Sequence, residues 1–271
     1  ITFAITPLDG TLKTINLTSA LPAITSPLAI DGLTQNGATC DLPKVELNGT
    51  SAGSGADGFT FTASDGLIQG FVINRFLGDG IILDGLSNTV RCNKIGTNAD
   101  GNADLGNGAR GMFLDTSHFN LIEQNTISGN GQSGILGSIA QYNRIENNII
   151  GLSSDGSTVI GNTQGGIVML GGHSNIIGGT TAAKRNVVSG NGFAGIGLTG
   201  STFGNIVKGN YVGVNSSGGG TTFGNTGPGI LLATSATDNF IGGTEAGAEN
   251  VIAFNTTQGV SLLSTAAAGN R

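Results

Sequence analysis

The stretch NTVRCNKIGTNADGNADLGNGARGMFL, residues 88–114, contains three short apolar segments that are separated by Asn and Gly. The segments are Thr89-Val90, Lys94-Ile95 and Met112-Phe113-Leu114. Short runs rich in β-branched residues and bounded by turn residues predict β-strands joined by tight turns. A unit of this size cannot bury its apolar side alone, so the stretch predicts a fold in which such units stack.

The same order of segments recurs along the chain. A Gly followed by alternating apolar residues opens each unit, and one Asn precedes each of the two later segments. Stacked units of this kind predict an all-β, right-handed, single-stranded parallel β-helix with three short strands per coil. Because Asn tolerates turn geometry and its amides can bond from coil to coil, we predict two ladders at two corners. The ladders are Asn88, Asn120, Asn143, Asn175, Asn205 and Asn239, and Asn93, Asn125, Asn148, Asn186, Asn210 and Asn250.

Long and short connections alternate between successive coils, so the full repeat comprises two coils. The long loops are Gly96–Arg110, Gly151–Gly165 and Gly213–Pro228, all at one corner. We expect their bases about 10 Å apart, forming a ridge beside the sheet of first strands. The chain is predicted to be one domain, 1–271, with a lead-in over 1–50 and regular coils over 51–271. Its abrupt ends suggest a piece of a longer protein.

Three stretches carry a resemblance to a known group of proteins. They are residues 88–114, quoted above, NIIGGTTAAKRNVVSGNGFAGIGL (175–198) and GNYVGVNSSGGGTTFGNTGPGILL (209–232). They resemble the parallel β-helix repeats of large bacterial secreted or surface proteins, within the pectate-lyase-like superfold. The resemblance implies the fold and an extracellular or cell-surface location. It does not imply an activity, because this scaffold carries lyases, hydrolases, epimerases, adhesins and spacers.

The composition excludes some classes of partner. The formal net charge is −6 and the pI is about 4.7, so no basic surface is available for nucleic acid. No apolar run approaches the length of a membrane span, and we expect no membrane insertion. No polar cap follows Gly259, so end-to-end self-association through open strand edges is expected.

Two cysteines, Cys40 and Cys92, are too few for a disulfide framework, and buried thiols, free thiols or one bridge all fit that count. Counting Val45, Phe71 and Lys94 as third-strand positions, the two cysteines lie two coils apart. Two rungs span about 9.6 Å, which exceeds the reach of a disulfide. We therefore predict free thiols.

The middle residue of each first strand is predicted to point outward. These residues are mostly apolar: Ile82, Phe113, Leu136, Val168 and Leu231. An exposed apolar strip of this kind indicates a binding surface for an extended glycan or protein, unless the long loops cover it.

A weaker catalytic hypothesis concerns five polar residues of two adjacent coils: Asp79, Asp84, Arg110, Asp115 and His118. Asp84 and Asp115 occupy equivalent positions, as do Asp79 and Arg110, so each pair is expected to be adjacent. Two close carboxylates beside His and Arg could act in general acid–base catalysis. The alternative is that the aspartates cap turns and that Asp79 and Arg110 form a surface ion pair.

No cofactor is expected. Asn98, Asp100, Asn102 and Asp104 alternate as in a calcium loop, which makes calcium an alternative, but the bidentate Glu of such loops is missing. His118, His173 and the cysteines lack zinc-ligand spacing.

The leading functional interpretation is a rigid extracellular β-solenoid segment that acts as a spacer or as an adhesin-like, glycan-binding module. The alternative is a polysaccharide lyase or hydrolase acting on an acidic glycan. The chain lacks Trp and has only Tyr142 and Tyr211, so exposed aromatic platforms for sugars are not expected.

Overall fold

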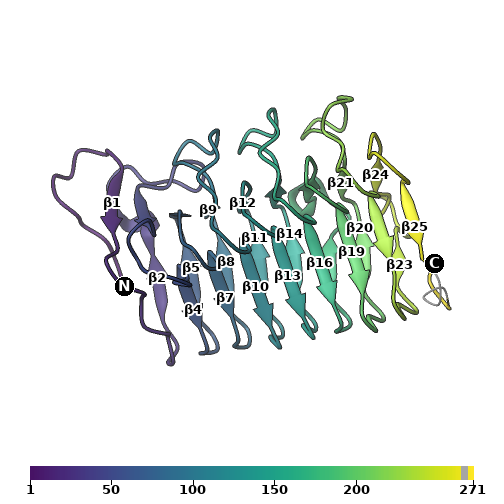
Figure 1. The fold of residues 1–271 in the computed structure, drawn as a ribbon, viewed down its shortest axis with the longest axis horizontal. Helices are drawn as coiled ribbons and strands as arrows, with labels where there is room; N and C mark the ends of the chain where they lie inside the picture. The colour runs from purple at the N-terminus through teal and green to yellow at the C-terminus, as the bar shows by residue number, and fades with distance from the viewer. Residues whose placement is uncertain (264–267) are drawn as a thin grey trace.

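The computed structural model describes residues 1–263 and 268–271, and it confirms the predicted right-handed parallel β-helix. The solenoid runs lengthwise from the N-terminal to the C-terminal coil in Figure 1, with each coil displaced along the axis from the one before it. Three parallel sheets, which we call sheets 1, 2 and 3 in the order that a coil visits them, extend along the solenoid.

The strands of each sheet pair with the equivalent strands of neighbouring coils. Sheet 1 contains β4 (Phe59–Phe61), β7 (Ile81–Leu83), β10 (Met112–Asp115), β13 (Ile135–Ser138), β16 (Ile167–Leu170), β19 (Ile196–Thr199), β22 (Ile230–Leu232) and β25 (Val260–Leu262). Sheet 2 contains β2 (Ala29–Asp31), β5 (Leu67–Gln69), β8 (Thr89–Arg91), β11 (Leu121–Glu123), β14 (Arg144–Glu146), β17 (Ile176–Gly178), β20 (Ile206–Lys208) and β23 (Phe240–Ile241). Sheet 3 contains β1 (Lys13–Asn16), β3 (Val45–Asn48), β6 (Phe71–Asn74), β9 (Lys94–Ile95), β12 (Thr126–Ile127), β15 (Ile149–Ile150), β18 (Val187–Val188), β21 (Tyr211–Val212) and β24 (Val251–Ile252).

The core is a column of apolar side chains that fills the inside of the coils. In β10, Met112 and Leu114 are fully buried and point inward, whereas Phe113 between them is partly exposed. Sheets 2 and 3 add one or two inward residues per strand, such as Ile122 and Ile127. Each fully buried side chain of this size contributes about 1.5–3 kcal/mol to the free energy of folding. The alternation along each strand therefore sets the register of the whole solenoid.

Both predicted Asn ladders are present, and all their members except the partly exposed Asn250 are buried. Each Asn donates its backbone N–H to Oδ1 of the equivalent Asn in the next coil, from Asn88 to Asn239 at the corner between sheets 1 and 2. The same bonds run from Asn93 to Asn250 at the corner between sheets 2 and 3. A third ladder, which we did not predict, lines the remaining corner with Asn107, Asn130, Asn162, Asn191, Asn225 and Asn255.

The lead-in has three short strands, β1, β2 and β3, with a 3-10 turn over Gly32–Thr34 directly after β2. A second 3-10 turn, over Ala182–Lys184, lies in the insert between β17 and β18. Apolar side chains of the lead-in pack against the end of the core, and the Phe3 ring meets the Phe71 ring edge-on at 5.3 Å between centroids. The lead-in therefore covers the N-terminal end of the apolar column.

The long loops lie against sheet 3, not beside sheet 1 as expected. They project from one edge of the solenoid in Figure 1. The Nζ atom of Lys94 in β9 donates to the carbonyl of Ala99 at 2.8 Å, and Gly218 lies against the ring of Tyr211 in β21. Gly96 directly follows β9 with a φ of 90°, which only glycine adopts readily, and it turns the chain back over the sheet that it has just left. The loops also join one another, because Ser154 donates its N–H to the carbonyl of Gly101 at 2.9 Å.

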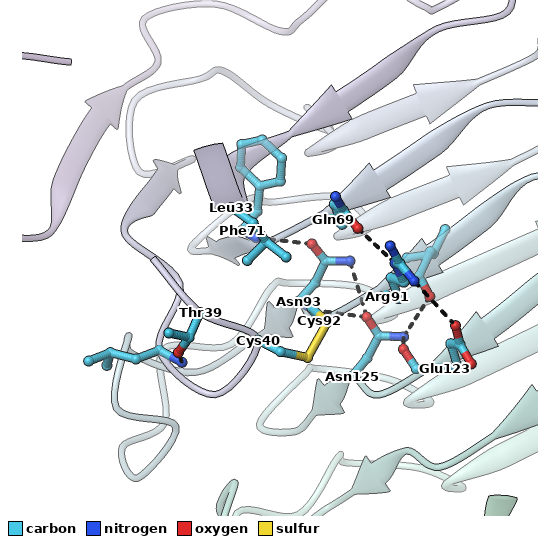
Figure 2. The surroundings of a disulfide bond; sticks show 12 residues. Leu33, Thr39, Cys40, Gln69, Phe71, Arg91, Cys92, Asn93, Glu123 and Asn125 are labelled. Carbon is cyan, nitrogen blue, oxygen red and sulfur yellow. Dashed lines mark hydrogen bonds and ion pairs between the residues drawn. A yellow bond between two sulfur atoms is a disulfide. The ribbon is translucent and has the colours of Figure 1, made fainter. Parts of the chain in front are cut away.

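The prediction of free thiols is wrong. Cys40 and Cys92 form a disulfide with a Cα–Cα distance of 4.6 Å (Figure 2). The pairing of β3, β6 and β9 confirms that Val45 and Lys94 lie two coils apart. Cys40, however, lies in the loop between β2 and β3, and this loop extends along the axis past the intervening coil. Cys92 sits in a left-handed corner conformation with a φ of 57°, just before Asn93.

Candidate functional site: an apolar corner ridge

A row of exposed apolar side chains lies at the corner between sheets 1 and 2. Successive coils place large apolar side chains there with 42–57% of their surface exposed. We call this surface the apolar ridge, and its members are Leu86, Phe119, Ile139, Tyr142, Leu170 and Phe203. Contiguous exposed apolar surface marks a site of interaction more often than scattered exposed residues do.

Four rings form a continuous stack along the ridge. Phe119 stacks on Tyr142 at 5.0 Å between centroids, Tyr142 meets His173 edge-on at 5.1 Å, and His173 stacks on Phe203 at 4.5 Å. The sequence interpretation considered Trp and Tyr and so predicted no aromatic platform. Two of the rings are Phe and one is His, and the signal was an aromatic residue one or two positions before the ladder Asn in four successive coils.

The backbone of the corner explains why these rings face outward. Phe119 and Tyr142 directly precede ladder residues Asn120 and Asn143, and both have left-handed φ angles, 60° and 56°. The ladder Asn points inward and is buried, so the preceding side chain points away from the core. Parallel pairing at the turn then places the rings of successive coils one above another, about one rung apart.

The predicted outward strip lies on sheet 1, next to the ridge. Ile82, Phe113, Leu136 and Val168 are aligned by the strand pairing and are partly exposed. The guanidinium group of Arg110 lies 3.9 Å from the centroid of the Phe113 ring. Leu231 is different, because it is 8% exposed and packs with Ala194 and Ala233. That this strip binds a partner stays a prediction.

The five catalytic candidates fall into two groups at opposite ends of β7 and β10. Asp79 and Arg110 precede these strands and form the expected ion pair, with 2.9 Å between Arg110 Nε and Asp79 Oδ1. Asp84, Asp115 and His118 follow the strands, and the pairing of Leu83 with Leu114 makes Asp84 and Asp115 neighbours, as expected. A strand of three or four residues separates the groups by about 10–13 Å. The groups therefore do not form a single acid–base cluster, and a catalytic role for either stays a prediction.

Asp79 is held in place from two sides. It is 3% exposed, and its Oδ1 also accepts the backbone N–H of Arg110 at 2.7 Å. Its own N–H donates to Oδ1 of Asp57 at 2.6 Å. Burial raises the pKa of Asp57, and the negative charge of Asp79 acts in the same direction, although the hydrogen bond from Asp79 opposes both. The arrangement fixes the chain just before the sheet 1 strands β4, β7 and β10 in three consecutive coils.

Three of the four calcium candidates, Asn98, Asn102 and Asp104, use side-chain oxygens to shape their own loop, and Asp100 makes no such bond among the described residues. Oδ1 of Asn98 accepts the N–H groups of Asn102 and Ala103 at 2.9 and 3.2 Å, and the Asn98 amide donates to Oδ1 of Asn102. Oδ1 of Asp104 accepts the N–H of Gly106. In the part of the chain that the structure describes, no group of three His, Cys, Asp or Glu side chains could hold a metal ion together.

Comparison with known proteins places the chain in a family. The family model for NosD, described as "Periplasmic copper-binding protein (NosD)", matches residues 24–179. The chain belongs to the NosD family. No curated protein matches this NosD-family chain significantly.

Several solved structures share the β-helix fold with this NosD-family chain. The A-modules of the mannuronan C-5 epimerases AlgE6 and AlgE4 from Azotobacter vinelandii are each 13% identical to it, with TM-scores of 0.44 and 0.40. The comparison covers 84% and 83% of this chain, respectively, and 72% of each epimerase module. The catalytic domain of a GH87 α-1,3-glucanase is 10% identical with a TM-score of 0.36, over 96% of this chain and 63% of that domain. No conclusion about the activity of this chain rests on these similarities.

The donor groups of this NosD-family chain do not fit a copper site. His118 and His173 lie two coils apart, about 9.6 Å along the axis, so they cannot share one ion. Met112 and Met169 are fully buried in the core, and both cysteines are in the disulfide. The Nδ1 atom of His118 is buried without a partner among the described residues, but one nitrogen does not make a site. These side chains therefore do not assemble a set of copper ligands.

The family description names the periplasm, whereas the sequence predicted a cell-surface or extracellular location. Among residues 1–263 and 268–271, no helix is long and apolar enough to cross a membrane.

Proposed function

We propose that this chain is an exported, rigid β-helix module that binds a protein partner along the apolar ridge. The observation that carries the proposal is the row of contacting rings Phe119, Tyr142, His173 and Phe203 over four consecutive coils, in which His173 is partly exposed and the other three are exposed. A stiff solenoid presents these side chains at fixed spacing. The module therefore loses little conformational freedom when a partner binds.

The orientation of the rings favours a protein over a glycan. Sugars bind aromatic side chains through the faces of the rings, but Phe119 and Tyr142 cover one face of each other, as do His173 and Phe203. The planes of Phe119 and Tyr142 differ by 9° and those of His173 and Phe203 by 25°, and the two pairs meet edge-on, which leaves less ring face open to a sugar. Ile139 and Leu170 beside it add aliphatic surface. Edges and aliphatic groups suit the apolar centre of a protein interface.

The disulfide supports export. Disulfides form and persist in oxidising compartments such as the bacterial periplasm and the cell exterior, and they are rare in the cytosol. The Cys40–Cys92 bond fits the periplasmic description of the family and equally fits the cell surface predicted from the sequence. We propose an exported location, with the periplasm and the cell surface as the two sites to distinguish.

A retention experiment tests the proposed function. The wild-type chain, the ridge variant Phe119→Ser/Phe203→Ser and the control Leu77→Ser/Phe193→Ser are immobilised separately. Leu77 and Phe193 are equally exposed but lie at the corner between sheets 3 and 1. Exported proteins of the source cell, and alginate, pectate and peptidoglycan, are then passed over each column.

We expect a protein that is retained by the wild type and by the control and is lost with the ridge variant. Equal retention by all three columns would contradict the proposal. Retention of a glycan through the ridge would move the function to carbohydrate binding. If no protein and no glycan is retained on any column, the spacer function is favoured over binding.

A further inference from the structure

A cavity of about 410 Å³ lies between sheet 3 and the loops that arch over it. Its floor is formed by the outward side chains of Lys94, Thr126 and Ile149, which succeed one another in β9, β12 and β15. This volume is within the range of about 300–1,000 Å³ that is typical of small-molecule sites. The cavity is separate from the apolar ridge, which lies at a different corner of the coil.

Covalent and hydrogen bonds hold the walls of the cavity. The loop residues Cys40 and Asp41 form one wall, and the disulfide to Cys92 ties that loop to the coil (Figure 2). Ser154 and Asp155 of the second long loop form another wall. The N–H and Oγ of Ser154 donate to the carbonyls of Gly101 and Asp100, both at 2.9 Å, which joins the second long loop to the first. The cavity is thus built by three segments that are distant in sequence.

The polar groups around the cavity are of two kinds. The first kind is already committed within the protein. Lys94 is 3% exposed and donates to the carbonyl of Ala99, while burial lowers its pKa against the opposing effect of Asp100 and Asp41. The carboxylate of Asp155 accepts hydrogen bonds from Ser153 and Ser157. These groups keep the walls in position.

The second kind has no hydrogen-bond partner. The side chains of Asp41, Gln124, Thr126 and Asn147 make no hydrogen bond within residues 1–263 and 268–271. Gln124 and Asn147 occupy equivalent left-handed corner positions in adjacent coils, with φ of 56° each, so their carboxamides lie about one rung apart at the rim. The cavity therefore offers a carboxylate, a hydroxyl and two carboxamides in addition to the apolar surface of Ile149.

We propose that this cavity binds one neutral sugar unit. Carboxamides and a hydroxyl donate to and accept from the hydroxyl groups of a sugar, a carboxylate accepts from them, and Ile149 meets the apolar C–H face of the sugar. Two carboxylates, Asp41 and Asp155, face the cavity against one ammonium group, that of Lys94. This charge balance disfavours uronic acids. The size suits a single sugar unit, free or at the end of a chain.

Binding of free sugars to the full chain tests the proposal, with ligand-observed NMR and calorimetry as readouts. The probes are glucose, mannose, galactose and N-acetylglucosamine, with glucuronic and galacturonic acid as charged counterparts. We expect saturable binding of at least one neutral sugar, and binding of its uronic acid at least about tenfold weaker. The proposal is overturned if no neutral sugar saturates, or if a uronic acid binds as tightly.

Two variants locate the site. Gln124→Ala/Asn147→Ala removes both free carboxamides from exposed corners and should weaken binding about tenfold or more. The control Gln141→Ala removes a carboxamide from the coil of Asn147 at the opposite end of β14, and should leave the affinity unchanged. Cys40→Ser/Cys92→Ser releases one wall and should weaken binding by a similar factor. Wild-type affinity in both double variants would overturn the assignment of this cavity. Neither result bears on the apolar ridge.

Discussion

Oδ1 of Asn175 accepts two hydrogen bonds from Asn143 in the preceding coil, one from the backbone N–H and one from Nδ2, each at 3.0 Å. The same Asn143 accepts both equivalent bonds from Asn120 and donates to the carbonyl of Ser117. One buried side chain therefore satisfies polar groups of three consecutive coils. The ladder ties the inside of each corner to the next coil in this way.

Asn143→Ala should destabilise the solenoid by about 2–4 kcal/mol, because it leaves the buried N–H and Nδ2 of Asn120 without their acceptor. Chemical denaturation followed by circular dichroism measures the change. Asn102→Ala, at an exposed loop position, is the control and should cost well under half as much. Equal losses for the two variants would show that the ladder does not stabilise the fold.

Replacement of the disulfide by Cys40→Ser/Cys92→Ser should lower the free energy of unfolding by about 2–4 kcal/mol. The bond closes a segment with a sequence separation of 52, and it restricts the unfolded chain accordingly. Denaturation of the wild type with and without reductant gives the same comparison without mutation. An unchanged midpoint in both experiments would contradict this expectation.

The second long loop should loosen only in strong acid. Hydrogen bonds from Ser153 and Ser157 lower the pKa of Asp155 to about 2, from an ordinary value of 3.8. A lowered carboxyl pKa stabilises the folded loop above pH 3.8, and this contribution is lost as the pH falls through about 2. Amide hydrogen exchange at Ser157 should accelerate over that range in the wild type. Asp155→Ala should already exchange rapidly at neutral pH, and slow exchange in the variant would refute the assignment.

End-to-end association of this chain stays a prediction. β24 and β25 are the last strands of sheets 3 and 1 among the described residues, and Val260 and Leu262 of β25 are 41% and 49% exposed. Open edges and apolar ends favour pairing with another chain. Sedimentation velocity should show concentration-dependent dimers, which Val260→Lys/Leu262→Lys reduces. Strictly monomeric wild type at high concentration would contradict the prediction.

The repeating part of the fold was predictable because each coil obeys the same local rules. Gly before a first strand and Asn before the two later strands gave the correct register for every pair from β7 to β22. The third ladder followed an equally regular signal, Gly106-Asn107, Gly129-Asn130 and their equivalents, but its members alternate between long loops and short turns. The spacing along the chain is therefore irregular although the spacing in space is constant.

The sequence did not predict the disulfide, the direction of the long loops or the row of rings, because these features depend on loops and turns outside the regular strands. Counting coils correctly predicted that Val45 and Lys94 lie two coils apart. Cys40, however, lies in a loop, and the pattern of strands in the sequence does not predict the path of a loop along the axis. The direction of the long loops depends on backbone angles such as that of Gly96. The ring stack joins residues at two different corner positions, Tyr142 and His173, so a search for one repeated position does not find it.

Site-specific crosslinking tests the central claim most directly. A photoreactive p-benzoylphenylalanine replaces Tyr142 on the apolar ridge or, as the control, Leu77 at the corner between sheets 3 and 1, and cells expressing each variant are irradiated. Both positions are exposed, so labelling efficiency is comparable. The account predicts a discrete protein adduct from position 142 that is absent from position 77. No adduct from position 142, or the same adduct from both positions, would contradict it.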